Sequence, residues 1–384
     1  MRILLDYRPA LRQRTGVGEY AHQLARALAA LPAGEGGVTV ELFTSSWKDR
    51  PSPAALAELG GIARIVDRRV PVRALNWAWH RLRWPPAEML AGAGYDVVHS
   101  PHPLLLPARR AARVLTIHDL DFLRHPERTR DEIHRDYPAF VRRDAQAADG
   151  VIVPSAHVGR LVAELLGLDP ARVAVCPEGG PGWARDPARP PGNRDGKYLL
   201  FLGTLEPRKN VQGLLDAYAA LVTRWPEAPP LVLAGRQTPD ADLWIEASRR
   251  PPLAGRVEYR GYVPDEAKRP LFEGARLLVL PSFDEGFGLP AVEAMTLGIP
   301  VVASNHGALP EVCGGAALLV DPDDRGSICS GMERVLREPG LAERLAERGT
   351  ARAADFSWTH SAELTLDAYR RAVARRAEGK AWRS

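Results

Sequence analysis

The sequence contains 384 residues, of which 45% are hydrophobic and 26% charged, with a formal net charge of +4, as expected for a soluble globular protein. This length exceeds that of one ordinary core and favours two α/β domains. No apolar run reaches the roughly 18 residues that a membrane-spanning helix requires, and the charge within the first apolar run argues against a secretion signal.

Short apolar runs alternate with segments of helical period through the first half of the chain. The helical segments include Val17–Leu31 and Asp131–Ala148. This alternation favours a parallel sheet with crossover helices. The predicted strands are Ile3–Asp6, Val38–Phe43, Ala63–Val66, Val97–His99, Arg113–Ile117, Gly150–Val153 and Val173–Cys176.

Residues 177–196, dense in Pro, Gly and Arg, interrupt this pattern and predict a linker. The alternation then restarts, so we expect two doubly wound, Rossmann-like α/β domains, residues 1–180 and 181–358. A last helix within 359–384, about Thr359–Arg376, is expected to return to the first domain. Open α/β sheets bind ligands beyond the carboxyl ends of their strands, so we expect the domains to face each other across a cleft. The second set of predicted strands is Tyr198–Gly203, Leu231–Ala234, Val257–Gly261, Leu277–Leu280, Val301–Ala303 and Ala317–Val320.

The cysteines indicate the redox environment of the chain. Cys176, Cys313 and Cys329 are odd in number and lack the spacing of a metal site. They fit small buried apolar residues in a reducing cytoplasm, which is the expected location.

The strongest motif runs from Pro281 to Pro300, where a predicted strand leads into a glycine-containing turn and then a helix. The turn contains Glu285 and is followed by Glu293 two helical turns later. Glycines let backbone N–H groups approach a ligand closely, and a helix N-terminus favours an anion. Two glutamates at this spacing can address both ends of a nucleotide sugar. Alternatively, Glu293 is a surface residue and the glycines only form a tight turn.

Three further blocks carry candidate chemistry. Arg208 and Lys209 are adjacent at the head of a helix, where a guanidinium fork and an ammonium suit a diphosphate. Gly16 and Gly18 open the first helix and permit close approach of phosphates or acceptor. His118 ends a strand and can hydrogen-bond a sugar or a developing charge. A solvated basic pair and a structural histidine are the alternatives.

Together these blocks resemble the retaining GT-B glycosyltransferases of family 4, in the same order along most of the chain. The resemblance implies that Glu285 contacts hydroxyls of the transferred sugar and that Glu293 holds the nucleotide ribose. It further implies that Arg208 and Lys209 bind the leaving diphosphate and that His118 acts near the sugar. The remaining donor-binding positions that it implies are Gly16, Gly18, Thr204, Tyr262, Val263, Gly286, Phe287, Gly288 and Leu289. Many members have Arg at the position of Thr204, so a third cation there is in doubt.

The resemblance also implies metal-independent transfer without a cofactor, in which the leaving phosphate helps to deprotonate the acceptor. Asp119 and Asp121 imitate a D-x-D metal motif, but the same spacing recurs at Asp240 with Asp242 and at Asp321 with Asp323. We therefore expect no metal. The sequence of residues 14–20 and 203–210 resembles that of mannosyltransferases of surface-polysaccharide assembly. This resemblance favours GDP-mannose over UDP-sugars or other GDP-sugars as the donor.

Arginines and tryptophans between residues 64 and 84 of the first domain give an indication of the acceptor. The basic excess lies in residues 1–180, with 24 Lys and Arg against 20 Asp and Glu. Such a composition suits a headgroup interface at an anionic membrane and a lipid-linked saccharide acceptor, with no nucleic-acid partner. Alternatively, the arginines are solvated and the tryptophans pack into the core. The residues concerned are Arg64, Arg68, Arg69, Arg73, Arg81 and Arg83 with Trp77, Trp79 and Trp84.

Other functions remain open. A nucleotide-sugar epimerase shares the expected architecture, but the basic pair together with both glutamates favours transfer. A phosphorylase would need a pyridoxal-binding lysine among only five lysines. A catalytically inactive glycan-binding protein would keep the fold without the reaction.

Overall fold

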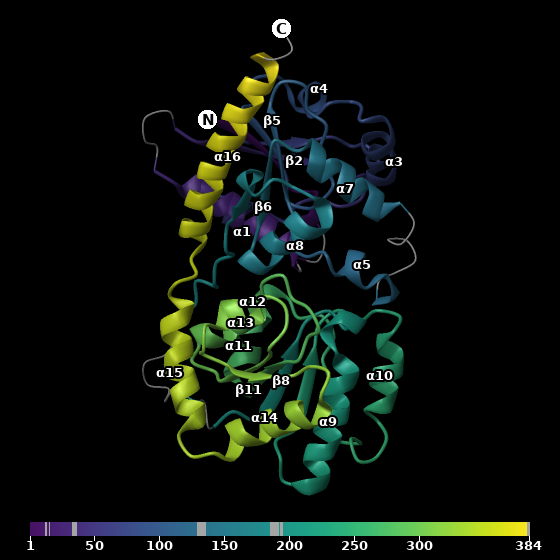
Figure 1. The fold of residues 1–384 in the computed structure, drawn as a ribbon, viewed down its shortest axis with the longest axis vertical. Coiled ribbons are helices and arrows are strands. Elements are labelled where there is room, and N and C mark those ends of the chain that lie inside the picture. Colours follow the sequence, from purple (N-terminus) through teal and green to yellow (C-terminus); the bar gives the residue numbers. More distant parts are fainter. Residues whose placement is uncertain are drawn as a thin grey trace. The chain divides into compact units, whose positions relative to one another are not determined.

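The structure is a computed structural model that describes residues 1–11, 14, 16–32, 37–128, 136–184, 192 and 195–381 (Figure 1). The chain divides into two compact units. Unit 1 comprises Met1–Arg124, Arg130–Gly179 and Ser357–Ser384, and unit 2 comprises His125–Thr129 and Gly180–Phe356. Each unit contains one parallel sheet with helices packed on it.

Unit 1 has a seven-stranded sheet with the order β3-β2-β1-β4-β5-β6-β7, in which every pairing is parallel. The strand order reverses between β1 and β4, which is the topological switch point where such sheets bind ligands. The strands are β1 Arg2–Asp6, β2 Thr39–Thr44, β3 Arg64–Asp67, β4 Val97–Ser100, β5 Ala112–Thr116, β6 Gly150–Val153 and β7 Val173–Val175. The helices are α1 Val17–Ala30, α2 Pro53–Glu58, α3 Val72–Trp77, α4 Ala87–Ala91, α5 Asp121–Arg124, α7 Tyr137–Ala147, α8 Ala156–Leu166 and α16 Trp358–Ala381.

Unit 2 repeats the arrangement with six parallel strands in the order β10-β9-β8-β11-β12-β13 and a switch point between β8 and β11. The strands are β8 Tyr198–Leu202, β9 Leu231–Ala234, β10 Val257–Tyr259, β11 Ala275–Leu280, β12 Val301–Ser304 and β13 Leu318–Val320. The helices are α9 Val211–Arg224, α10 Ala241–Ala247, α11 Asp265–Glu273, α12 Leu289–Thr296, α13 Leu309–Cys313, α14 Arg325–Arg337 and α15 Leu341–Ala353.

The strands are apolar on both faces because helices cover both sides of each sheet. In β8, Leu200 and Leu202 belong to one buried cluster, whereas Leu199 and Phe201 belong to the cluster on the opposite face. This alternation is the two-residue period of a strand, and burial of both faces explains the nearly continuous apolar runs. The doubly wound α/β prediction is therefore confirmed, and every predicted strand is present within two residues at each end.

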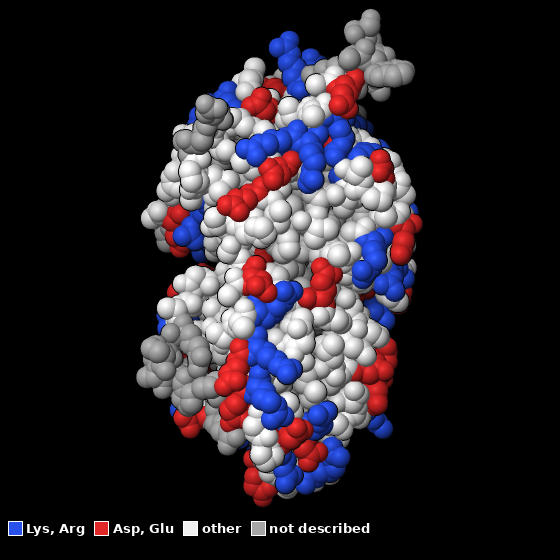
Figure 2. Space-filling view, turned by 60° about the vertical axis from the view of Figure 1, so that its left-hand side comes forward, with Lys and Arg blue, Asp and Glu red and all other residues white. Residues whose placement is uncertain are grey.

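Two predicted segments extend beyond the described residues. The helix predicted over Asp131–Ala148 is observed as α7, and residues 129–135 lie outside the described part of the chain. Much of the predicted linker, residues 185–191 with 193 and 194, also lies outside it. Both units expose basic and acidic side chains on the face shown in Figure 2. The basic excess of the first half thus does not produce a surface of one sign on that face.

A buried hydrogen-bond chain fastens α16 to the sheet of unit 1. The Tyr369 hydroxyl lies 2.6 Å from Nδ1 of His99, whose Nε2 lies 2.8 Å from Oγ1 of Thr116. The Thr116 hydroxyl in turn lies 3.1 Å from that of Tyr20 on α1. Both partners of His99 are hydroxyls, which can donate or accept, so a neutral imidazole with one N–H and one lone pair satisfies both contacts. Burial lowers the pKa of His99 to about 3, so it stays neutral.

The buried histidines predict acid sensitivity. Burial lowers the pKa of His99 to about 3 and that of His80 to about 4, from an ordinary value of 6.5. Below about pH 6.5 the unfolded chain binds protons at these positions that the folded chain does not. The free energy of unfolding should therefore decrease as the pH is lowered below about 6.5, by up to about 1.4 kcal/mol per pH unit for each histidine. Urea unfolding at pH 7.5 and 5.5 measures this, and equal stability at both would contradict it.

Candidate functional site

The carboxyl edge of the unit 2 sheet is lined by backbone at three consecutive strand ends. Gly235, which follows β9, donates its N–H to the carbonyl of Gly261 after β10 at 2.7 Å. A Cβ at Gly235 would lie 1.8 Å from the carbonyl oxygen of Gly203, which follows β8, and its φ is +139°. Only glycine fits this approach. The half-buried Thr204, Tyr262 and Val263 follow these glycines directly.

The basic turn after β8 is held by an asparagine that the sequence analysis did not single out. Arg208 and Lys209 form the short 3-10 helix Pro207–Lys209, and Asn210 follows with a φ of +55°. The Asn210 amide donates to the carbonyls of Pro281 at 3.1 Å and Pro322 at 2.8 Å, while its oxygen caps α9. Asn210 therefore ties the basic turn to the loops that follow β11 and β13.

Lys209 and Glu285 form a buried ion pair. The Lys209 Nζ atom lies 2.6 Å from both carboxylate oxygens of Glu285, and the Ser282 hydroxyl donates to one of them at 2.8 Å. Arg208 lies 3.7 Å from the same carboxylate and donates to the Asp284 carbonyl at 3.0 Å. Burial acts to raise the pKa of Glu285, but the Lys209 and Arg208 charges and the hydrogen bonds from Lys209 and Ser282 outweigh burial and lower it. The carboxylate is thus held ionised, as an acceptor for hydroxyl groups.

The turn after Glu285 presents backbone at the start of α12. Gly288 caps this helix with a φ of +101°, and a Cβ there would lie 2.6 Å from the Leu309 side chain. Gly307, with a φ of +66°, lets the next loop approach closely enough for the Ala308 N–H to bond the Glu285 carbonyl at 2.9 Å. The residues Gly286, Phe287 and Leu289 complete the turn into α12. A helix N-terminus beside two cations is suited to anionic oxygens.

Glu293 is buried on α12, which rules out the alternative of a surface residue. Its Oε1 atom lies 3.2 Å from Nζ of Lys268 on α11, and Lys268 also lies 3.3 Å from Asp265. The sequence analysis did not single out Lys268. This lysine places a positive charge beside the Glu293 carboxylate, whose oxygens can accept hydrogen bonds.

In unit 1, His118 follows β5 and both of its ring nitrogens contact acceptors. Nδ1 lies 3.1 Å from Oε1 of Glu178, and Nε2 lies 3.1 Å from the Pro101 carbonyl oxygen. The Tyr20 ring meets the imidazole edge-on, with centroids 4.6 Å apart. Glu178 is a further residue that the sequence analysis missed, because it lies 60 residues from His118.

The two glycines at the start of α1, Gly16 at the N-cap and Gly18 in the first turn, have different roles. Gly16 has a φ of +44° with open space where a Cβ would lie, so its backbone can approach a ligand. A Cβ at Gly18 would lie 2.8 Å from the Pro9 carbonyl oxygen, so Gly18 is required by packing within unit 1. Residues 12, 13 and 15 of this loop lie outside the described part of the chain.

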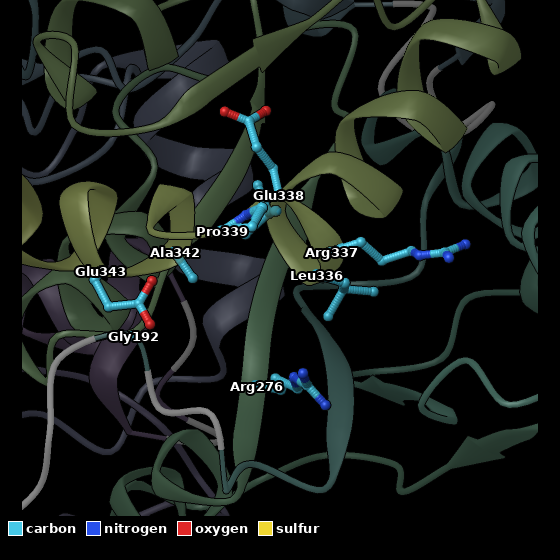
Figure 3. Close-up of a pocket in the computed structure, with 9 residues that line it drawn as sticks. Gly192, Arg276, Leu336, Arg337, Glu338, Pro339, Ala342 and Glu343 are labelled. Atoms are coloured by element: carbon cyan, nitrogen blue, oxygen red, sulfur yellow. The ribbon is translucent and has the colours of Figure 1, made fainter.

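Two other features lie apart from the motif residues. His306, Asp321 and Asp323 form an exposed cluster of potential metal ligands, whose ligand atoms lie within 4.8 Å of one another. It is the cluster of this kind found among the described residues. A cavity of about 140 Å³ is lined by Arg276, near the amino end of β11, and by Glu338 and Glu343 from the α14–α15 junction. In Figure 3 the Glu338 side chain points away from Arg276. None of the predicted site residues lines this cavity.

The buried ion pair predicts a measurable coupling. Lys209→Met leaves the Glu285 carboxylate buried without its main counter-ion, which should cost about 3–5 kcal/mol of unfolding free energy. Adding Glu285→Gln removes that charge and should restore part of the loss. Urea unfolding followed by tryptophan fluorescence measures both, with the exposed Lys197→Met as the matched control. Equal stability of the single and the double variant would show that the pair is not coupled.

Comparison with known proteins gives the family. The model described as Glycosyltransferase Family 4 matches residues 14–179, and that described as Glycosyl transferases group 1 matches residues 185–352. O-antigen chain mannosyltransferase B of Escherichia coli is 43% identical over 173 residues, which are 45% of this chain and 45% of that protein. The chain thus spans less than half the length of that relative.

Other similarities extend along the whole chain. D-inositol 3-phosphate glycosyltransferase of Frankia alni is 30% identical over 403 aligned positions, covering 95% of this chain and 96% of that protein. The solved structure of sucrose-phosphate synthase from Thermosynechococcus elongatus has a TM-score of 0.77 at 21% identity, with 97% and 99% of the two chains covered. With a relative of this identity along nearly its full length, the chain belongs to the group 1 glycosyltransferases of family 4 and has their two-domain GT-B fold.

Proposed function

We propose that the protein is a retaining, metal-independent glycosyltransferase that moves a hexose from a nucleotide sugar to a saccharide acceptor in surface-polysaccharide or glycolipid assembly. The observation that carries this proposal is the buried pair of Lys209 and Glu285 beside Arg208 at the switch point of unit 2. It brings two cations and a fixed carboxylate acceptor to one sheet edge. A sugar diphosphate offers the matching groups, namely anionic oxygens and hydroxyl donors.

Each motif residue receives a role in this proposal. Lys209 and Arg208 bind the leaving diphosphate, and Glu285 accepts hydrogen bonds from the sugar hydroxyls. The turn Gly286, Phe287, Gly288 and Leu289 supplies backbone N–H groups. Gly16 supplies a second backbone approach, and Gly18 supports it by packing closely against Pro9. Glu293 holds the ribose, Thr204 lies beside the diphosphate, Tyr262 and Val263 meet the base, and His118 hydrogen-bonds the transferred sugar.

The proposed reaction breaks the bond between the anomeric carbon and the diphosphate oxygen and forms a bond to the acceptor oxygen on the same face. The proton of the acceptor hydroxyl passes to the leaving phosphate. Lys209, Arg208 and the turn amides stabilise the negative charge that develops on that phosphate, which is the largest contribution this site can make to the rate. The donor and acceptor are substrates, and no cofactor is part of the proposal.

Mannose from GDP-mannose is the proposed transferred group. The 43% identical relative is named a mannosyltransferase, and its similarity covers nearly half of this chain. An epimerase of the same architecture or an inactive glycan-binding protein are the alternatives. The two buried, lysine-paired glutamates support transfer, since two fixed carboxylate acceptors suit the hydroxyl groups of a sugar donor.

The test is incubation with a panel of nucleotide sugars in the presence of EDTA. We expect slow donor hydrolysis or transfer, fastest with GDP-mannose. Glu285→Gln should remove most turnover with little change in nucleotide affinity, whereas Glu293→Gln should weaken nucleotide binding itself. Wild-type turnover of both variants at low donor concentration would overturn the assignment. Activity lost with EDTA and restored by Mn²⁺ would revive Asp119 with Asp121, or His306 with Asp321 and Asp323, as a metal site.

A lipid-linked acceptor at the cytoplasmic face of an anionic membrane is also proposed. No helix in the described part of the chain combines the length and apolar character that a bilayer span requires. Six of the nine exposed large hydrophobic side chains identified there lie between residues 47 and 89. They are Trp47, Leu56, Trp77, Leu82, Trp84 and Met89. Such exposed apolar groups next to basic residues suit a headgroup interface.

Several residues of the predicted arginine and tryptophan surface are buried or already paired. Trp77 and Trp84 are 60% and 53% exposed, but Trp79 is 1% exposed and packs in the core against Phe43. Arg83 pairs with Asp144 at 2.7 Å, and Arg64 and Arg81 pair with Glu41 and Asp136.

Arg68 donates to the Leu90 carbonyl, which leaves two arginines as candidates for the surface. Arg69 and Arg73 are exposed, and no ion pair to either is found among the described residues. Two arginines of α16 help to hold that helix in place, since Arg375 donates to the Asp149 carbonyl and Arg376 to that of Arg109. The candidate surface is therefore Trp77, Trp84, Arg69 and Arg73.

Vesicle binding tests this surface. We expect the protein to co-sediment with anionic vesicles at low salt and less at about 0.5 M NaCl, where charges are screened within a few ångströms. Two double variants should weaken binding, namely Trp77→Ser with Trp84→Ser and Arg69→Glu with Arg73→Glu. For the second, each arginine near the surface contributes about 1 kcal/mol. The matched control is Leu243→Ser, since Leu243 is a hydrophobic residue of unit 2 that is even more exposed than the two tryptophans. Equal, negligible binding to anionic and neutral vesicles would favour a soluble acceptor.

A further inference from the structure

A neutral imidazole beside an ionised Glu178 cannot satisfy both contacts of His118, because both facing oxygen atoms then only accept hydrogen bonds. Nδ1 faces the Glu178 carboxylate at 3.1 Å and Nε2 faces the Pro101 carbonyl oxygen at 3.1 Å. The side chains of His118 and Glu178 are only 16% and 6% exposed, so water offers little alternative. Tyr20 packs against the ring and fixes its plane.

The protons of this group can be counted. A carbonyl oxygen only accepts, an ionised carboxylate only accepts, and a neutral imidazole has one N–H and one lone pair. Both contacts are satisfied if the imidazole carries two protons beside an ionised Glu178. They are also satisfied if Nε2 carries the one ring proton and Glu178 is protonated and donates to Nδ1. In both arrangements Nε2 carries a proton that points at Pro101.

His99, on the neighbouring strand, provides an internal comparison. Its ring lies between the hydroxyls of Tyr369 and Thr116, and a hydroxyl can either donate or accept a hydrogen bond. That arrangement suits a neutral ring with one lone pair. The two histidines therefore differ in their partners, and what distinguishes His118 is the carboxylate that follows β7.

We propose that Glu178 is a positioning residue for His118. It fixes the imidazole so that Nε2 is a hydrogen-bond donor and has no lone pair with which to take a proton. This inference rests on the proposed function, in which His118 contacts the transferred sugar. It limits His118 to donating hydrogen bonds to sugar oxygens and leaves the diphosphate as the group that accepts the acceptor proton.

A double-mutant cycle tests the action of Glu178 through His118. Glu178→Gln should lower kcat on the order of 10²-fold, as expected when a catalytic group is misplaced, with little change in the KM for the donor. In the His118→Ala background, the same substitution should change kcat little, because its target is gone. Equal losses in both backgrounds would show a purely structural role, and no loss in either would also overturn the proposal. The matched control is Glu164→Gln, an exposed glutamate on α8 of the same unit.

A second measurement does not depend on turnover. In the full chain with ¹⁵N-labelled histidine at pH 7.5, the His118 ring signals are identified as those absent from His118→Ala. We expect Nε2 to carry a proton, and the ring signals to move in Glu178→Gln but not in Glu164→Gln. A wild-type ring protonated at Nδ1 alone would overturn the inference even if transfer is observed. The expected spectra without any transfer would instead contradict the proposed function.

Discussion

The site in unit 2 depends on one interaction, the ion pair of Lys209 with the buried carboxylate of Glu285. A buried carboxylate without a counter-ion would be neutralised or would destabilise the fold by several kcal/mol. The two residues lie 76 positions apart, yet they meet because β8 and β11 are adjacent across the switch point. The strand order of the sheet thus places the cations beside the acceptor that they keep ionised.

This ion pair constrains the loops around it. Asn210 must hold the basic turn against the loops after β11 and β13, and the backbone of Arg208 accepts a hydrogen bond from Phe283 at 2.9 Å. Gly307 must lack a side chain because its Cβ would lie 2.7 Å from the Glu285 nitrogen. These residues contribute no chemistry themselves. They keep the charged groups in one geometry, which electrostatic catalysis requires because the donors must be oriented before charge develops.

Unit 1 uses its polar residues differently. Its sheet holds two histidines on adjacent strands, one between two hydroxyls and one between a carboxylate and a carbonyl. The first fastens α16 to the sheet and is buried beyond reach of solvent. The second lies at the carboxyl edge, where α/β sheets bind ligands. The same side chain therefore has different hydrogen-bond partners according to where the fold places it, and only the histidine at the carboxyl edge lies where a ligand could reach it.

The sequence by itself determined the two α/β domains and most of the motif residues. Apolar runs, turn glycines and the spacing of Glu285 and Glu293 are local patterns, and local patterns survive in any packing consistent with the fold. The tertiary structure alone decided which residues meet across the chain. Glu178 reaches His118 over 60 positions, Lys268 reaches Glu293 over 25, and Trp79 is buried while Trp77 and Trp84 are exposed. Such pairings depend on strand order and helix packing, which bring together residues whose separation in the sequence carries no signal of contact.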